Sequence, residues 1–466
     1  MNDLASRAYG RFHEPHAARR AALACMVTLA VALGIGRFAF TPLLPLMLHG
    51  GAAGQPLLDI QHGGWLASAN YAGYFVGAVT CAALRVSPGR MVRLGLAATV
   101  LLTLAMGLAG PFWFWALVRF VAGAVSAWTF VFASQWGLRR LAELGAHAWS
   151  GVIYTGPGVG IVGTGLLVSV AGGYGATAGW IGFGVIGSVL SALVWPVFAD
   201  GARAGSGSGR MARARAASAA DAKPDGAARA ATAANAAGNE RAAEPGNRIG
   251  NRIGNESGGQ SVAPTSAPSS AHRADAFWLI LLYGIPGFGY IITATFLPVI
   301  ARHALPGSAW PDLFWPMFGA ALIVGALLGA RLPAHWDNRV LLAGCYVLQA
   351  IGIALGIVWP TAGGFSLGSI LIGLPFTAIT LFAMREARRL RGDDAAGLMG
   401  YATAAYGIGQ IAGPLVAAPI AAHAGTFSPA LWLAAGALIA GAVGLVAVAR
   451  VPRERKHNRM PDCGCN

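Results

Sequence analysis

Long apolar stretches recur along almost the whole chain, and they limit what it can fold into more than any other feature. Roughly 20 consecutive apolar residues cross the hydrocarbon core of a bilayer as one helix. Stretches of this kind predict an all-α polytopic membrane protein with about twelve transmembrane helices. The helices are expected at residues 21–48, 64–84, 91–109, 112–137, 148–171, 176–198, 276–300, 311–332, 339–359, 364–386, 397–422 and 428–449.

The composition agrees with a membrane location. Charged residues make up 11% of the chain and hydrophobic residues 56%, whereas a soluble domain carries about 25% charged residues. The formal net charge is +15, but the basic residues lie at the ends of apolar stretches and in one polar insert. They do not gather with aromatic residues on one face, so the lipid bilayer, and not a nucleic acid, is the expected partner.

The distribution of arginines predicts the orientation. The connections after the second, fourth, eighth and tenth expected helices contain Arg85, Arg90, Arg93, Arg139, Arg140, Arg331, Arg339, Arg388, Arg389 and Arg391. The connections on the other side contain only Arg302. Since basic connections stay in the cytoplasm, both termini are expected there, which requires an even number of helices.

A polar insert divides the chain into two halves. Residues 201–275 contain no Phe, Trp or Tyr and are rich in Ala, Gly, Ser, Asn and Arg, which predicts a disordered cytoplasmic linker. The expected parts are a cytoplasmic tail at 1–20, a six-helix bundle at 21–200, the linker at 201–275, a second six-helix bundle at 276–450 and a cytoplasmic tail at 451–466.

The two halves repeat each other. GIGRFAFTPLLPLM (Gly34–Met47) matches GFGYIITATFLPVI (Gly287–Ile300) at a spacing of 253 residues, with two glycines, a leucine and a proline in register. The pair Gly156 and Pro157 in the fifth helix has a counterpart in Gly413 and Pro414 in the eleventh. Both halves start in the cytoplasm, so the repeat is parallel, as in transporters whose two bundles rock about a central site.

These motifs resemble the major facilitator superfamily (MFS). Arg119 and Gly123 in RFVAG resemble its Arg-x-x-x-Gly motif, and GVIYTGPGVGIVGTG resembles its Gly-Pro motif. GIGRFAFTPLLPLM followed by GGWLASANYAGYFVGA is similar to the bacterial YbfB-like branch. The resemblance implies a multi-pass protein of the bacterial inner (plasma) membrane with transmembrane transporter activity.

The resemblance also assigns roles to loops and glycines. The conformational-lock loops correspond to Arg85, Arg90 and Arg93, where the family's acidic residue is missing, and to Arg331, Asp337 and Arg339, where it is present. Gating or helix packing is expected of Gly156, Pro157, Gly160, Gly413 and Pro414.

Two arginines lie inside apolar stretches. An arginine near the bilayer centre costs roughly 2.5–3.5 kcal/mol, so Arg37 is expected to face the bundle interior or a water-filled cavity. Two interpretations stay open: Arg37 binds a carboxylate or phosphate with its planar fork, or it caps backbone carbonyls and braces neighbouring helices. Arg119 is expected to act in proton coupling or in helix bracing.

No Asp or Glu occurs in the middle of an expected helix, so the interior charge is positive and an anionic substrate would offset it. The candidate substrate-binding residues are Arg37, Asn70, Tyr74, Tyr154, Tyr290, Tyr406 and Gln410. A proton or a counter-anion is the expected coupling partner.

The predicted function is secondary transport of a small solute, an organic anion or an amphipathic metabolite, by alternating access. A multidrug or metabolite efflux exchanger of the same fold is the alternative, and a non-transporting membrane sensor is a third interpretation. The sequence has no metal-ligand spacing, no His/Cys/Asp cluster and no phosphate loop, so neither an enzyme nor a cofactor is expected. A monomer is expected.

Overall fold

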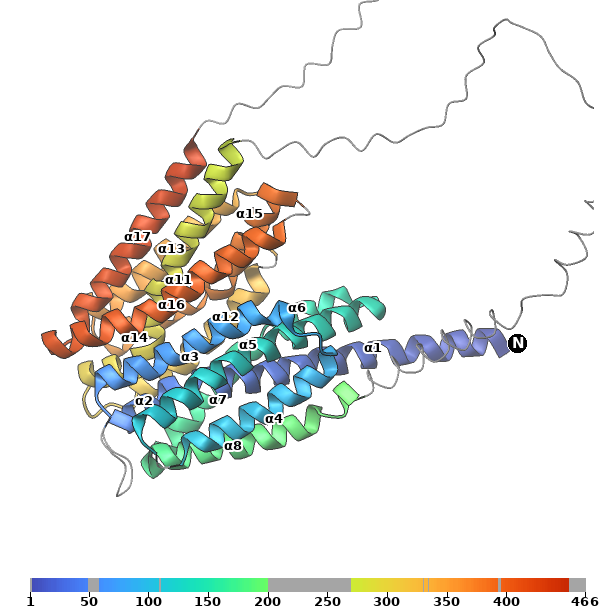
Figure 1. The fold of residues 1–466 in the computed structure, drawn as a ribbon, viewed down its shortest axis with the longest axis horizontal. Coiled ribbons are helices and arrows are strands. Elements are labelled where there is room, and N and C mark those ends of the chain that lie inside the picture. Colours follow the sequence, from blue (N-terminus) through green and yellow to red (C-terminus); the bar gives the residue numbers. More distant parts are fainter. Residues whose placement is uncertain are drawn as a thin grey trace, which may run out of the picture. The chain divides into compact units, whose positions relative to one another are not determined.

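The computed structural model describes residues 2–48, 58–108, 110–199, 270–329, 331–333, 335–392 and 395–451 (Figure 1). The predicted linker up to residue 269 and the tail from residue 452 lie outside the described residues. The first half contains α1 (Asn2–Leu29), η1 (Ala30–Phe38), α2 (Phe40–Leu48), α3 (Ile60–Thr80), η2 (Cys81–Ala83), α4 (Pro88–Met106), α5 (Phe112–Glu143), η3 (His147–Trp149), α6 (Ser150–Ile153), α7 (Gly156–Ala171), η4 (Gly172–Tyr174) and α8 (Gly175–Val194). The second half contains α11 (Ser270–Ala304), α12 (Pro311–Gly329), α13 (Asn338–Val358), α14 (Ala362–Gly373), α15 (Phe376–Arg391), α16 (Ala395–Ala424) and α17 (Ser428–Arg450).

The predicted all-α membrane fold is confirmed. Ten helical stretches of the described residues are long and apolar enough to cross a membrane. One of them, His147–Val194, holds two crossings, α7 and α8, which are separated by a turn at Gly175 with φ of 83°. Helix α3 is not among the ten, although its 21 residues are long enough to span.

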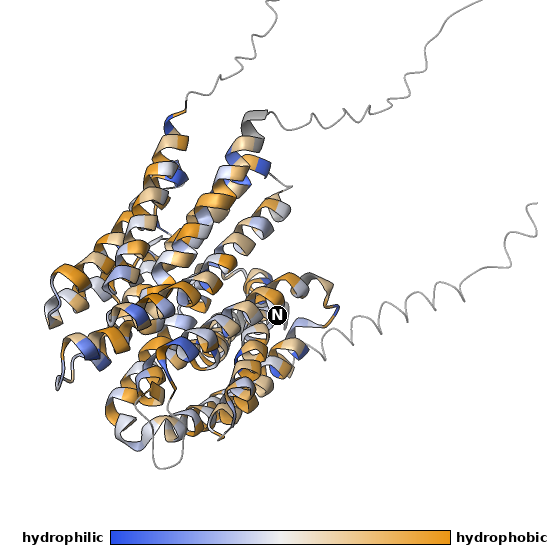
Figure 2. Ribbon diagram, turned by 60° about the vertical axis from the view of Figure 1, so that its left-hand side comes forward, coloured by the Kyte–Doolittle hydropathy of each residue, from blue (hydrophilic) through white to orange (hydrophobic). Residues whose placement is uncertain are grey.

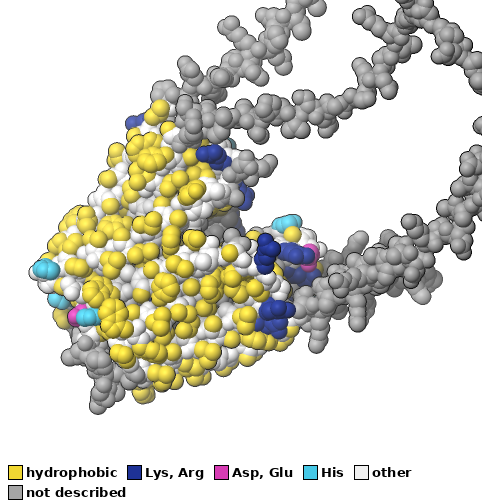
Figure 3. All heavy atoms as spheres, in the orientation of Figure 1, with side chains coloured by type: hydrophobic (Ala, Val, Ile, Leu, Met, Phe, Trp, Pro, Cys, Tyr) yellow, Lys and Arg dark blue, Asp and Glu magenta, His cyan; other side chains and the backbone are white. Residues whose placement is uncertain are grey.

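The outer surface of the helices is apolar. Hydrophobic residues predominate along the helices (Figure 2), and large hydrophobic side chains such as Trp113, Val170 and Leu193 are 73%, 87% and 70% exposed. Water would penalise such a surface and lipid would not. Lys and Arg side chains gather at one end of the molecule, the basic end, on the right in Figure 3.

Glycines allow the helices to approach until their backbones touch. A Cβ atom on Gly73 would lie 1.8 Å from the carbonyl oxygen of Phe120, and one on Gly123 would lie 2.0 Å from that of Asn70, so α3 and α5 require glycine at their crossing. In the second half, a Cβ on Gly409 would lie 2.3 Å from the carbonyl oxygen of Gly284. Such small residues are how helices pack tightly in lipid.

The Gly-Pro positions lie at equivalent crossings in the two halves. Gly160, on α7, packs against Gly34 in η1, and Gly156 packs against α1 at Leu29. Gly413, on α16, packs against Ile291 in α11. Pro157 and Pro414 follow Gly156 and Gly413 directly in these helices. The parallel repeat predicted from the sequence therefore appears as matched contacts of the fifth crossing with the first and of the eleventh with the seventh.

The most extensive contacts between the halves are those of α3 with α16 and of α7 with α12, and α2 also packs on α11. At the first seam, a Cβ atom on Gly64 would lie 3.0 Å from the Pro414 carbonyl oxygen. At the second seam, one on Gly158 would lie 2.9 Å from the carbonyl oxygen of Gly319. Both seams are therefore close backbone contacts that larger side chains would hold apart.

Candidate functional site

The first membrane crossing changes its winding at its centre. Residues Ala30–Phe38 form a π-helix between two α-helices, and all nine are buried. A π-helix is wider than an α-helix and is frequent at functional sites. Arg37 belongs to this segment, which places its guanidinium in the interior between the two halves.

Arg119, on α5, holds this segment in place. Its side chain is 2% exposed, and its Nη1 and Nη2 atoms donate hydrogen bonds to the carbonyl oxygens of Gly36 at 3.3 Å and Arg37 at 3.2 Å. Its guanidinium lies 4.7 Å from the ring centroid of Phe40. Of the two roles expected for Arg119, these contacts fit helix bracing. Asn70 donates in turn to the backbone oxygen of Arg119 at 2.8 Å.

The Arg37 side chain is 5% exposed and is surrounded by aromatic rings. Its guanidinium carbon lies 4.1 Å from the centroid of Tyr74, 5.0 Å from that of Tyr71 and 5.2 Å from that of Phe38. Cation–π attraction stabilises a buried guanidinium, by about 2 kcal/mol when it is desolvated. Among the described residues, neither Arg37 nor Arg119 forms an ion pair with a carboxylate.

One hydrogen bond connects Arg37 to the second half. Its Nη2 donates to Oε1 of Gln410, on α16, at 2.9 Å, and the Gln410 side chain is 4% exposed. The amide nitrogen of Gln410 donates to the hydroxyl of Tyr290, on α11. The Tyr290 ring is held by an edge contact with Phe376 and a near-parallel contact with Tyr406, with centroids 5.0 and 6.0 Å away.

Three further hydrogen bonds join the halves. Tyr71 bonds to Thr295 at 3.1 Å through their hydroxyls, and Ser68 donates to the Ile411 carbonyl oxygen at 2.9 Å. Thr41 donates to the carbonyl oxygen of Ala294 at 3.0 Å. The last two residues are 253 positions apart, which is the repeat spacing, so equivalent residues of the two halves meet there. Equivalent residues touch only on the axis that relates the halves, and this site lies on that axis.

The structure therefore brings five of the seven candidate substrate-binding residues into one connected cluster: Arg37, Tyr74, Tyr290, Tyr406 and Gln410. Asn70 lies one turn before Tyr74 and is occupied with the α5 backbone. Tyr154 contacts Phe130, with ring centroids 6.3 Å apart, and has no direct contact with this cluster.

Sequence reasoning omitted Tyr283, whose ring stacks on Tyr406 at 5.0 Å. A usable signal was present: Tyr283 precedes Tyr290 by two helical turns, so the two rings share one face of α11. The Tyr283 hydroxyl donates to Thr380, on α15, at 3.1 Å.

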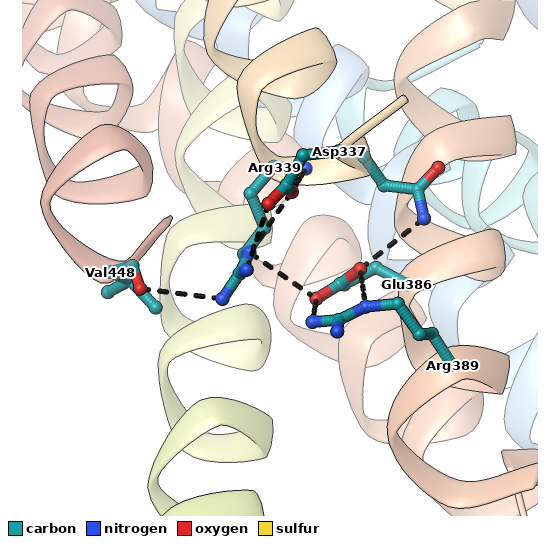
Figure 4. Close-up of polar contacts among 6 residues, drawn as sticks. Asp337, Arg339, Glu386, Arg389 and Val448 are labelled. Carbon is teal, nitrogen blue, oxygen red and sulfur yellow. Dashed lines mark hydrogen bonds and ion pairs between the residues drawn. The ribbon is translucent and has the colours of Figure 1, made fainter. Parts of the chain in front are cut away.

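The loop expected to act as a lock in the second half holds a network of charges (Figure 4). Asp337 accepts two bonds from the Arg339 side chain, at 3.2 and 2.9 Å. Glu386, 1% exposed, accepts two from Arg389 at 2.8 and 2.6 Å, and Arg339 lies 3.6 Å from it. Partial burial raises the pKa of the Asp337 carboxyl, but hydrogen bonds from Arg339 outweigh it and hold the pKa below its usual value. Arg331 is exposed.

The corresponding loop of the first half differs. Arg85 and Arg90 are exposed, and the Arg93 guanidinium lies 5.8 Å from the ring centroid of Trp195. The surface is hollowed between the halves at the basic end (Figure 3). Among the described residues, the four hydrogen bonds given above between the halves involve residues of the middle and the opposite ends of their helices.

Comparisons with known proteins agree with this architecture. Two solved structures share the fold. One is a crystal structure of a mutant of the nucleoside transporter NupG, with 14% identity, a TM-score of 0.61 and coverage of 92% of this chain and 99% of that one. The other is a crystal structure of nucleoside transporter NupG, with 11% identity, a TM-score of 0.59 and coverage of 94% of this chain and 100% of that one. No curated protein matches the sequence. The profile of a family described as "Uncharacterised MFS-type transporter YbfB" matches residues 29–223 and 253–446. The chain therefore belongs to the YbfB family of MFS-type transporters.

Proposed function

We propose that this transporter moves an amphipathic organic monoanion across the bacterial inner membrane by alternating access, with Arg37 as the anion-binding group. The observation that carries the proposal is a buried guanidinium on the axis between the halves, without a carboxylate partner among the described residues. Burying an uncompensated cation costs desolvation free energy, and a bound anion would offset it. At this position the anion would contact both halves.

The surroundings of Arg37 favour one negative charge on an apolar body. Both Nη atoms of Arg119 donate to backbone carbonyls and only its Nε has no partner, whereas Arg37 also reaches the second half, so Arg37 is the guanidinium placed to bind a ligand between the halves. The Arg37 guanidinium is surrounded by the rings of Phe38, Tyr71 and Tyr74. These rings suit the apolar groups of a ligand and cannot replace the hydration shell of a small dianion.

The arrangement of contacts supports a cytoplasm-facing state. The hydrogen bonds at Thr41 and Ser68 close the halves at one end, and the surface hollow lies at the other, basic end. Basic ends of membrane proteins face the cytoplasm, which supports a cytoplasmic location of both termini. Rocking of the two bundles about the axis would open the closed seam and expose Arg37 to the other side.

A ligand screen with matched variants tests the proposal. Purified protein is heated with organic monocarboxylates, with their uncharged amides and with a nucleoside, and the unfolding temperature is recorded. Monocarboxylates should stabilise the native protein through mass action and should leave Arg37→Gln unchanged. Arg139→Gln is the control, because it removes an arginine whose side chain is 82% exposed at the basic end.

Counterflow in proteoliposomes then asks whether a stabilising carboxylate is transported. Stabilisation by the nucleoside or by the amides alone would contradict the anion proposal and favour an uncharged substrate, such as the one named for NupG. Equal stabilisation of the native protein and Arg37→Gln would remove Arg37 from the binding site.

A further inference from the structure

The edge of the Arg37 guanidinium that faces Gln410 is only half occupied. The Nε–H and Nη2–H groups of an arginine point the same way and form one edge of its planar fork, which matches the two oxygens of a carboxylate. Gln410 accepts from Nη2, whereas Nε is buried and has no hydrogen-bond partner. A single amide oxygen therefore occupies a position built for two.

Two other arginines of this chain show the same edge fully occupied. In Figure 4, Asp337 takes both Nε and Nη2 of Arg339, and Glu386 takes both Nε and Nη2 of Arg389. Both partners are carboxylates. The edge is not filled at every arginine, since Arg302 holds Asp312 through Nη2 alone and its Nε has no partner. The two filled edges show the geometry that a carboxylate would adopt at Arg37, where Nε is open to a second oxygen.

The orientation of the Gln410 amide follows from Arg37. A guanidinium can only donate hydrogen bonds, so it takes the amide oxygen, and the amide nitrogen on the other side donates to the hydroxyl of Tyr290. The Tyr290 ring is in turn held between Phe376 and Tyr406. Gln410 is thus a rigid extension of the second half that reaches a cation of the first half, and their bond is one of the connections that keep the halves together at the axis.

We infer that Gln410 is a stand-in for the substrate carboxylate: it occupies Nη2 of Arg37 while the site is empty, and the substrate displaces it by engaging Nε and Nη2 together. The inference rests on the proposed function and adds its coupling step. A carboxylate binds a guanidinium more strongly than an amide oxygen does, because the bond is charge-assisted on both sides and bidentate. Since the displaced bond joins the halves, substrate binding weakens the contact between them and eases their rocking. Binding and movement are coupled through one hydrogen bond.

Carboxylate affinities of two variants test this, because one variant is expected to bind carboxylates more tightly and the other to lose binding. The probes are acetate, the smallest carboxylate, and benzoate, each paired with its amide, and binding is measured by titration calorimetry on the purified full chain in lipid nanodiscs. Gln410→Leu removes the competing oxygen and should bind the carboxylates about tenfold more tightly, since hydrogen bonds to charged groups are of that strength. Gln410→Glu supplies a tethered carboxylate and should lose carboxylate binding.

The matched control is Thr41→Val, which removes a different hydrogen bond between the halves, the one to Ala294. It should leave carboxylate affinity unchanged. A gain in Thr41→Val equal to that in Gln410→Leu would overturn the inference, because looser halves alone would then explain the effect.

The distance between spin labels at Arg139→Cys and Arg388→Cys, in a background without other cysteines, reports the movement itself. Benzoate should shift the native distance distribution toward that of ligand-free Gln410→Leu, and benzamide should not. Weaker carboxylate binding in Gln410→Leu than in the native protein would make Gln410 an ordinary binding residue, which overturns the inference and leaves the proposed function standing. Absence of carboxylate binding to the native protein would overturn both.

Discussion

Glu386→Gln should destabilise the second half through a charge imbalance in the network of Figure 4. The native network balances Arg339 and Arg389 against Asp337 and Glu386. The substitution keeps the shape but leaves one excess positive charge beside a site that is 1% exposed. Breaking a buried ion pair costs about 3–5 kcal/mol. Arg389, whose side chain is 46% exposed, can turn toward water, which lowers the expected loss of unfolding free energy to about 2–3 kcal/mol.

Steric-trap unfolding in bicelles measures this free energy at equilibrium. The double variant Glu386→Gln/Arg389→Gln restores the charge balance and should be more stable than Glu386→Gln alone, although it has lost one more native side chain. A gain in stability from a second substitution is expected only if the charge imbalance is what destabilises Glu386→Gln. If the double variant is less stable than the single one, or if Glu386→Gln changes stability by less than about 0.5 kcal/mol, as an ordinary surface substitution does, the network is not a stabilising unit and the reasoning is refuted.

Three further predictions follow from other parts of the structure. Gly123→Ala should cost about 1–3 kcal/mol of unfolding free energy, because its Cβ would lie 2.0 Å from the Asn70 carbonyl oxygen, whereas Gly163→Ala, with open space around it, should be neutral or stabilising in the same bicelle assay. Arg119→Lys should cost about 2 kcal/mol in that assay and weaken carboxylate binding, because an ammonium keeps the charge but serves one of the two carbonyls. The pKa of Asp337 is lowered in the folded protein, so its contribution to stability is present above the usual carboxyl pKa and is lost as the pH falls through the folded value. Unfolding temperatures recorded between about pH 5 and pH 2 should fall less steeply in Asp337→Asn than in the native protein, and parallel curves would contradict this.

The number and type of helices followed from the sequence because each crossing must be long and apolar on its own. The repeat was visible because glycines and prolines at helix crossings tolerate few replacements; Gly34 and Gly287, for example, both lie where a Cβ would strike a neighbouring helix within 2.4 Å. The interior location of Arg37 was predictable for the same kind of reason, since an arginine in an apolar stretch has to face the protein.

The partners of Arg37 could not be predicted in the same way. Gln410 is 373 residues away, and which residues meet across the axis depends on helix packing that no local pattern encodes. The π-helix at Ala30–Phe38 was missed because hydropathy does not distinguish a wider turn from an α-helical one. Glu386 is the last residue of the helix expected at 364–386, and its burial beside Arg389 depends on the packing of the neighbouring loop, which the sequence does not show.

The repeat also bears on why only one of the two equivalent positions near the axis holds an arginine. The repeat spacing makes Tyr290 the counterpart of Arg37, as Ala294 is of Thr41. A faithful repeat would place a second guanidinium one turn from the axis, and two cations about 4 Å apart repel by about 4 kcal/mol at the effective dielectric of a protein. The second half instead offers a phenol, which anchors Gln410 toward the single cation. The departure from symmetry thus gives the two halves different tasks: the first supplies the charge, and the second supplies a neutral oxygen that a carboxylate can replace.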